Sequence, residues 1–177
     1  MPELCIPEIA VVPKEKLQES VLGKRGLSIS VLKSDCVASA KVPLTPMGVS
    51  ALAASGLKIR LEQGAGMQSS YPDSQYSESG AEITSSKDSL MKADIVLKPS
   101  PFAADEISKA KEGQTLISPL GIARASRECI ELMLRKKVVS IAMEYIQTEK
   151  GFYPISQINS EIAGRCAIFA GAGLLGK

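Results

Sequence analysis

Short segments in which apolar and polar residues alternate are spread along most of the chain, with segments of helical spacing between them. The strand-like segments are residues 27–32, 58–62, 93–98, 115–118 and 138–143, with a briefer one opening at Ile83. The segments with helix signals are residues 45–55, 73–79, 86–91, 105–111 and 125–136. This alternation of strand and helix predicts an α/β domain built on a mostly parallel sheet.

Two of the predicted helices carry the clearest local signals. The helix after Thr45 begins with an N-cap threonine followed by Pro46, and it ends at the pair Ser55-Gly56. The helix over 125–136 carries apolar residues that we expect on or near its inner face, namely Ile130, Leu132, Met133 and Leu134.

In a parallel α/β sheet, ligands bind beyond the carboxyl ends of the strands. The predicted strands end at residues 33–41, 64–66, 98–101, 118–121 and 143–145. A ligand site is therefore expected among these five segments.

The beginning of the chain departs from the alternating pattern. Residues 1–26 contain three prolines that break any long helix, so they predict an N-terminal extension with one short amphipathic helix from Pro13 to Leu22. These residues lack the apolar centre of a secretory leader. No apolar run in the sequence approaches the roughly 20 residues that a membrane helix needs. We therefore expect a soluble, intracellular chain.

The last residues contain a glycine pattern with two interpretations. Residues 171–176 match G-x-G-x-x-G and follow an apolar segment. The pattern is a dinucleotide fingerprint only where a helix and a βαβ unit follow it, and none follows within these residues. The alternative is a helix from about Ser160 to Leu175, although each glycine costs about 1 kcal/mol relative to alanine there. We favour the helix.

Composition narrows the chemistry further. The chain has no His, which excludes a His general base, a Ser-His-Asp triad and every His metal site. Its 21 basic and 19 acidic residues give a net charge of +2, and only 4% of residues are aromatic, so we expect no nucleic-acid partner. None of the four cysteines lies in a C-x-x-C spacing, so we expect reduced thiols and no metal.

Five short motifs, in order, resemble one protein family. Residues 41–49, KVPLTPMGV, resemble the R-V-A-L-T-P-x-G-V motif of alanine dehydrogenases and of the alpha subunit of proton-translocating NAD(P) transhydrogenase. Downstream, EQGAG at 62–66, GAEI at 80–83, ADIVLK at 93–98 and SEIAGR at 160–165 resemble their E-x-G-A-G, G-A-E-I, A-D-I-V-L-K-V and S-E-V-A-G-R. Order and spacing agree over about residues 27–177.

The resemblance implies a fold and a domain plan. Residues 27–159 would form a three-layer Rossmann-like (flavodoxin-like) domain, and residues 160–177 a helix that connects to a separate NAD-binding domain. NAD would then be bound only together with that second domain, which lies outside these 177 residues. We expect the isolated chain to be inactive.

The family's acid–base groups are replaced in this chain. The resemblance places Lys41 where alanine dehydrogenases have the arginine that holds the substrate carboxylate. It places Ser100 where they have a catalytic lysine and Gly121 where they have a catalytic histidine. Alanine oxidation needs a proton acceptor, and neither of these two positions retains one. The transhydrogenase alpha subunits resemble this chain in lacking both groups, since hydride transfer between two nicotinamides needs neither.

Three functional hypotheses follow from the resemblance. The first is part of an NAD(P) transhydrogenase alpha chain, in which hydride transfer between NAD(H) and NADP(H) is coupled to proton translocation by membrane-embedded partner subunits. The second is an alanine-dehydrogenase-like domain without its acid–base residues, which residues 151–165 resemble more closely. The third is a non-catalytic truncated remnant. The expected partners are an NAD-binding domain or subunit and, through the C-terminal helix, a second copy of the chain.

Five residues are candidates for a substrate or cofactor cleft: Lys41, Lys98, Ser100, Gly64 and Gly66. Lys98 ends a central strand, where its charge faces either the cleft or solvent. The alternative for Lys41 is a surface lysine in a loop. We expect Gly64 and Gly66 to be turn glycines with positive φ rather than nucleotide contacts.

Two more charged residues have open interpretations. Glu144, directly after the last strand, is either a carboxylate base or a salt-bridged or solvated side chain. Arg165 is expected to pair with a nearby acidic residue as a structural contact.

Overall fold

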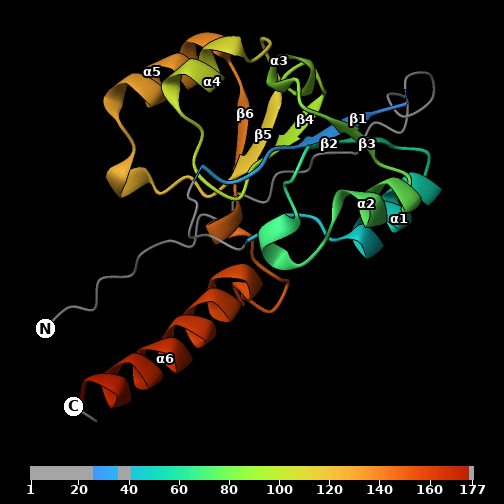
Figure 1. Ribbon diagram of the computed structural model, residues 1–177. Helices are drawn as coiled ribbons and strands as arrows, with labels where there is room; N and C mark the ends of the chain where they lie inside the picture. Colours follow the sequence, from blue (N-terminus) through green and yellow to red (C-terminus); the bar gives the residue numbers. More distant parts are fainter. Residues whose placement is uncertain (1–25, 36–40, 176–177) are drawn as a thin grey trace, which may run out of the picture.

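The computed structural model describes residues 26–35 and 41–175, and these form one six-stranded sheet with helices on both faces (Figure 1). All strand pairs are parallel, in the order β3-β2-β1-β4-β5-β6. The strands are β1 (Ser28–Val31), β2 (Lys58–Glu62), β3 (Glu82–Thr84), β4 (Ile95–Leu97), β5 (Thr115–Ser118) and β6 (Val139–Ala142). The predicted helix over 13–22 lies outside the described residues.

Five helices cover the two faces of the sheet. They are α1 (Pro46–Ala54), α2 (Asp73–Glu78), α3 (Lys87–Leu90), α4 (Ala104–Lys109) and α5 (Arg127–Lys136). In Figure 1, α1 and α2 lie on one side of the sheet, and α3, α4 and α5 lie on the other. The short turns η1 (Met67–Ser69), η2 (Ile122–Arg124) and η3 (Met143–Tyr145) follow β2, β5 and β6. The Thr45 side chain caps α1 by accepting a hydrogen bond from the Gly48 N–H, as its motif predicts.

Two hydrophobic cores lie on opposite faces, because successive strand residues point to opposite sides. Val31 is buried in one core and Leu32 in the other. The first core joins β1 and β2 to α1 and α2, and its buried residues are Val31, Val49, Ile59, Leu61, Tyr76 and Ala81. The second joins β4 and β5 to α3 and α4, and its buried residues are Leu32, Leu90, Met91, Val96, Phe102, Ile107, Ala110 and Leu116.

The direction of winding reverses between β1 and β4, which are neighbours in the sheet. From β1 the chain winds outward through β2 to β3, and from β4 it winds the other way through β5 to β6. The loops after β1 and β4 therefore diverge, and such a switch point is where doubly wound folds bind ligands. The predicted α/β, Rossmann-like fold with a C-terminal helix is confirmed. Its strand order is that of the dinucleotide-binding folds.

Helix α5 buries a narrower face than the sequence predicts. Leu132 and Met133 pack against the second core together with Cys129, at the i, i+3, i+4 spacing of one helix face. Ile130 and Leu134 lie beside that face and are 40% and 72% exposed. Of the four apolar residues predicted on or near the inner face, Leu132 and Met133 therefore lie on it, and Ile130 and Leu134 lie at its margin.

The C-terminal helix α6 (Pro154–Leu175) extends away from the sheet, and only its first turns contact the domain, at η3 (Figure 1). It begins at Pro154 rather than near Ser160, in agreement with the preference of proline for the first helical position. Gly171 and Gly173 lie inside this helix, so the helical interpretation of the glycine pattern is confirmed. Arg165 pairs with Glu161 one turn away, as expected. None of the described helices is long and apolar enough to cross a membrane.

Tyr76 is the largest fully buried side chain and links α2 to the residues that precede α1. Its hydroxyl donates a hydrogen bond to the Leu44 carbonyl oxygen at 2.9 Å. Burial, together with the smaller effects of the charges of Tyr71 and Asp73, raises the pKa of Tyr76 to about 12. Because the folded state holds the phenol protonated, this contribution to stability is complete below pH 10 and is lost as the pH rises towards 12.

We expect Tyr76→Phe to lower the free energy of unfolding by about 1 kcal/mol at neutral pH, since one buried hydrogen bond is lost. The variant should also lose less stability than the parent between pH 10 and 12. Urea unfolding at several pH values measures both effects. Tyr145→Phe is the control, because Tyr145 is 61% exposed. Equal alkaline losses in the parent and in Tyr76→Phe would contradict this account.

Candidate functional site

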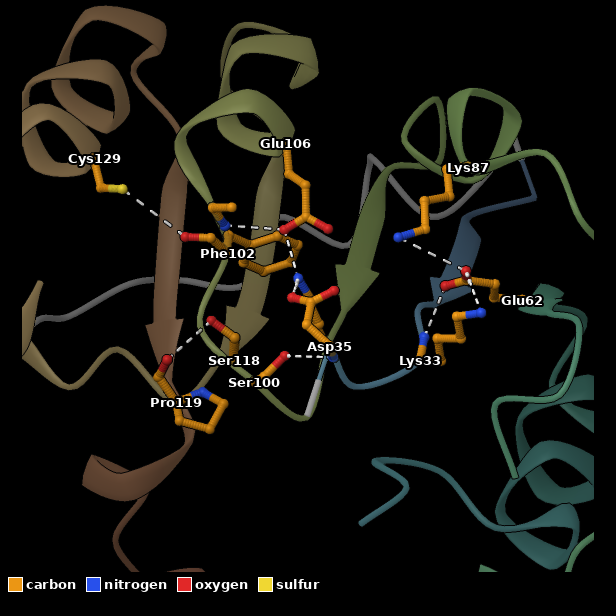
Figure 2. Close-up of polar contacts among 12 residues, drawn as sticks. Lys33, Asp35, Glu62, Lys87, Ser100, Phe102, Glu106, Ser118, Pro119 and Cys129 are labelled. Carbon is orange, nitrogen blue, oxygen red and sulfur yellow. Dashed lines mark hydrogen bonds and ion pairs between the residues drawn. The ribbon is translucent and has the colours of Figure 1, made fainter. Parts of the chain in front are cut away.

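A cluster of three charged side chains lies at the switch point between β1 and β4, with Lys98 and Glu106 buried and Asp35 53% exposed. Lys98 directly follows β4, and its side chain is 0% exposed. Its ammonium Nζ donates to Glu106 Oε2 at 2.6 Å and also to Asp35 Oδ2. Figure 2 shows the carboxylates of Asp35 and Glu106 pointing towards each other. One cation is thus shared by two carboxylates that come from the loop after β1 and from α4.

Secondary structure explains how these three side chains meet. Lys98 is two residues beyond Val96, which faces the second core, so strand alternation directs the lysine to the same face, beneath α4. Glu106 lies in the first turn of α4 and also accepts the Ala103 N–H at 2.9 Å. The Phe102 ring lies 5.7 Å from the ammonium, which suits a cation–π contact.

Ser100 and Glu62 position the loop that carries Asp35 (Figure 2). The Asp35 N–H donates to Ser100 Oγ at 3.5 Å. Glu62, at the end of β2, is buried and accepts the Lys33 N–H at 2.9 Å. The loop after β1 is therefore held by both neighbouring strands, β2 and β4.

A cleft of about 670 Å³ lies at the same carboxyl edge of the sheet. It is bounded by the loop before α1, by η1 and its following loop, by η3 and by the base of α6. Its polar lining residues are Lys41, Ser69, Tyr71, Glu144 and Asn159, and its other lining residues are Val42, Pro43, Pro99, Pro119, Met143 and Ile155.

Glu144 holds the turn after β5 instead of standing free in this cleft. Its carboxylate accepts the Leu120 N–H at 2.9 Å and the Gly121 N–H at 2.7 Å. Burial alone raises the pKa of Glu144, but hydrogen bonds from the N–H groups of Gly121, Glu144 itself and Leu120 outweigh burial and lower it below 4.5. A carboxylate whose charged form is stabilised in this way is a poor proton acceptor at neutral pH.

The five predicted site residues do not come together in one place. Lys41 is exposed and lines the cleft. Lys98 neither lines it nor faces solvent, since it is completely buried between two carboxylates. Ser100 contacts the Asp35 loop. Whether any of them binds substrate or cofactor stays a prediction.

The two glycines differ in their backbone conformation. Gly64 has φ +76° and donates its N–H to the Asp73 carboxylate at 3.0 Å, so it is the turn glycine expected. Gly66 has φ −96°, so its predicted positive φ is wrong. Glycine is required at position 66 by packing, because a Cβ would lie 2.5 Å from the Tyr76 ring and 2.7 Å from the Tyr71 carbonyl oxygen.

Sequence reasoning missed Asp35, Glu106, Tyr71 and Asn159. Lys98 lies at the end of a strand, Glu106 in the following helix and Asp35 in an earlier loop. No rule of sequence spacing predicts that side chains from these three kinds of element meet. Asn159 reaches the cleft because α6 begins at Pro154, earlier than predicted. The one available signal was the topology, since the carboxyl ends of β1 and β4 meet at a switch point.

The cleft can bind an anion more readily than it can transfer a proton. Its ionisable lining residues are Lys41, Tyr71 and Glu144, and the last is occupied by backbone N–H groups. Across residues 26–35 and 41–175, no group of three or more His, Cys, Asp or Glu side chains is arranged to hold a metal ion.

Known proteins resemble this chain in both sequence and structure. It is 35% identical over 133 residues to an alanine dehydrogenase of Mycolicibacterium smegmatis, covering 75% of this chain and 36% of that protein. It is 36% identical over 138 residues to an alanine dehydrogenase of Methanococcus maripaludis, covering 77% of this chain and 37% of that protein. The chain therefore spans little more than a third of these relatives.

Two solved structures share the fold at 27% sequence identity. An L-alanine dehydrogenase superposes with a TM-score of 0.76 over 82% of this chain and 40% of the other. A transhydrogenase from Sinorhizobium meliloti superposes with a TM-score of 0.57 over 65% of this chain and 35% of the other. The family described as alanine dehydrogenase/PNT, N-terminal domain, matches residues 36–163, and with the switch-point topology this shows that the chain belongs to that family.

Proposed function

We propose that this chain forms one wall of a hydride-transfer cleft that an NAD-binding domain completes. The observation that carries the proposal is the cleft at the carboxyl edge of the sheet, whose rim includes Ile155 and Asn159 at the base of α6. A helix that leads from the cleft towards solvent is well placed to carry a second domain over it. Lys41 then supplies a cation for a substrate carboxylate or a cofactor phosphate, as a point charge without the bidentate geometry of arginine.

The chemistry of the cleft favours transfer between two nicotinamides. Glu144 is occupied by backbone N–H groups, and Ser100 and Gly121 offer no base. Hydride transfer from NADH to NADP⁺, which yields NAD⁺ and NADPH, requires no proton acceptor at this wall, whereas oxidation of alanine does. This supports the role of a transhydrogenase alpha chain, peripheral to membrane-embedded subunits that would couple it to proton translocation.

A second candidate has its own support. The L-alanine dehydrogenase superposes better than the transhydrogenase, with TM-scores of 0.76 and 0.57, and the curated relatives named above are alanine dehydrogenases. The chain would then be an alanine-dehydrogenase-like domain that has lost its acid–base groups. A non-catalytic remnant is the third possibility, and activity assays separate it from the other two.

The deciding experiment combines the chain with a separately produced NAD-binding domain and follows two reactions. One receives NADH and an oxidised nicotinamide analogue with a distinct absorbance, and the other receives L-alanine and NAD⁺. We expect hydride transfer only in the first. Pyruvate formation by the unmodified chain would contradict the assignment, and no reaction in either would favour the remnant. A variant with Ser100→Lys and Gly121→His tests whether the two missing groups restore alanine turnover.

We also expect the isolated chain to bind NADH weakly. Its glycine pattern lies inside α6, so Gly171 and Gly173 form no phosphate-binding turn ahead of a helix, and that turn contributes much of dinucleotide affinity. Titration calorimetry should give no binding in the low-micromolar range. Low-micromolar binding of NADH, reduced by Lys41→Ala, would show that the cleft itself is sufficient.

A further inference from the structure

Helix α6 rests on the domain through its first turn. Residues 154–156 are half-buried, whereas residues 157–170 are all exposed. The loop that leads into the helix, residues 146–153, is exposed as well, and within it the Thr148 N–H donates to the Phe152 carbonyl oxygen at 2.8 Å. The direction in which α6 leaves the domain therefore depends on few contacts at its base.

One hydrogen bond joins this first turn to the end of the sheet. Ser156 Oγ donates to the Glu144 carbonyl oxygen at 3.0 Å, which closes the loop between the two residues. Glu144 lies in η3, the turn that directly follows β6 and against which the base of α6 packs (Figure 1). The position of α6 therefore follows the position of η3.

Backbone pairing between β5 and β6 stops just before η3. Its last pair is Ser118 with Ala142, and Pro119 has no N–H to donate. Beyond this point the Glu144 side chain supplies the connection, because its Oε1 atom accepts both N–H groups of the turn at 120–121, at 2.9 and 2.7 Å. A side chain, rather than the sheet, thus joins η3 to this turn.

We propose that Glu144 is a positioning residue, whose acceptor oxygen holds η3 to the turn at 120–121 and thereby fixes the direction in which α6 leaves the cleft. The cleft is lined from all three elements, by Pro119 before the turn, by Glu144 in η3 and by Ile155 in α6. A shift of η3 changes both the direction of α6 and the place where a second domain stands over the cleft. The first consequence belongs to this chain alone, and the second rests on the proposed function.

The direction of α6 can be measured as a distance between two nitroxide labels. One label is attached to Cys166, which is exposed on α6, and the other to Met47→Cys, at a position that is 83% exposed on α1. Cys5→Ser, Cys36→Ser and Cys129→Ala remove the other three cysteines. Double electron–electron resonance gives the distribution of distances between the labels. We expect one narrow distribution in this background.

Two substitutions of similar size separate the acceptor oxygen from the volume of the side chain. Glu144→Met removes the acceptor, so it should broaden the distance distribution and speed exchange of the Leu120 and Gly121 amide hydrogens about tenfold. Glu144→Gln keeps a carbonyl oxygen at the same place and should retain the narrow distribution and the slow exchange. Glu149→Met is the matched control, since Glu149 is exposed in the loop before α6, and it should change neither readout.

Ser156→Ala tests the second link of the chain of contacts. It removes the hydroxyl that donates to η3 and leaves the Glu144 carboxylate in place, so it should broaden the distance distribution without changing exchange at 120–121. Circular dichroism confirms that each variant folds. A parental distribution in Glu144→Met or in Ser156→Ala would overturn the proposal, and so would a Glu144→Gln distribution as broad as that of Glu144→Met.

The hydride-transfer assay separates this proposal from the proposed function. With the NAD-binding domain present, Glu144→Met should lower the rate of transfer about tenfold or more, because the two walls of the cleft are no longer held in register, and Glu144→Gln should restore it. No transfer in the parent would refute the proposed function and leave the distance measurements to decide the role of Glu144. Transfer at the parental rate by Glu144→Met with a broadened distribution would overturn the consequence for the second domain.

Discussion

Lys98→Met is expected to lower the free energy of unfolding by about 3–5 kcal/mol, the range for removal of one partner from a buried ion pair. The lysine side chain is completely buried, and the Glu106 side chain is only 12% exposed. Without the ammonium, the Glu106 carboxylate is left among apolar residues such as Phe102 and Ile107 with the Ala103 N–H as its remaining donor. Urea unfolding at pH 7 measures the loss.

Two variants separate the loss of charge pairing from the loss of packing. Lys98→Met combined with Glu106→Gln removes the uncompensated charge and should recover part of the stability. Lys109→Met removes an exposed lysine that pairs with Asp88, and it should have no measurable effect. Two results would contradict this account of Lys98 and Glu106 as a stabilising buried ion pair. One is an equal free energy of unfolding for Lys98→Met and the parent, and the other is a double variant less stable than Lys98→Met.

Gly66→Ala is expected to destabilise the domain by about 1–3 kcal/mol or more, because the added methyl group overlaps its neighbours. The Cβ would lie 2.5 Å from the Tyr76 ring and 2.7 Å from the Tyr71 carbonyl oxygen. The ring is fully buried and held by its hydrogen bond to Leu44, and the carbonyl belongs to the backbone, so neither moves easily. The φ of −96° suits alanine, so backbone strain contributes nothing to this cost.

A glycine in open surroundings is the matched control. Gly164 lies in α6, and a Cβ there would meet nothing within 4 Å. Gly164→Ala should therefore stabilise the helix by about 1 kcal/mol, the difference in helix propensity. Thermal unfolding of both variants measures the opposite signs. Equal stability of Gly66→Ala and the parent would show that the Tyr71–Tyr76 packing can adapt to the methyl group.

Local sequence signals were sufficient for the elements and for the class of fold. The alternating residues 58–62 and 115–118 form β2 and β5 over those residues, and Thr45-Pro46 begins α1. These signals succeed because strand and helix periodicities reflect which residues face a core, and that depends on near neighbours in sequence. The resemblance in the ordered motifs was also sufficient to identify the family.

Only the tertiary structure decided which charged residues meet and which apolar faces stay uncovered. Lys98 is a strand-end lysine in sequence, but α4 and the loop after β1 enclose it with Glu106 and Asp35. For Glu144 the sequence leaves open a carboxylate base or a salt-bridged or solvated side chain, and the structure shows that the backbone N–H groups of the turn at 120–121 bind it. Leu134 and Phe169 have the pattern of core residues and yet lie exposed. Each outcome depends on contacts between different secondary-structure elements and loops. The winding of the sheet sets the distances between these elements, and neither periodicity nor helix or strand propensity encodes those distances.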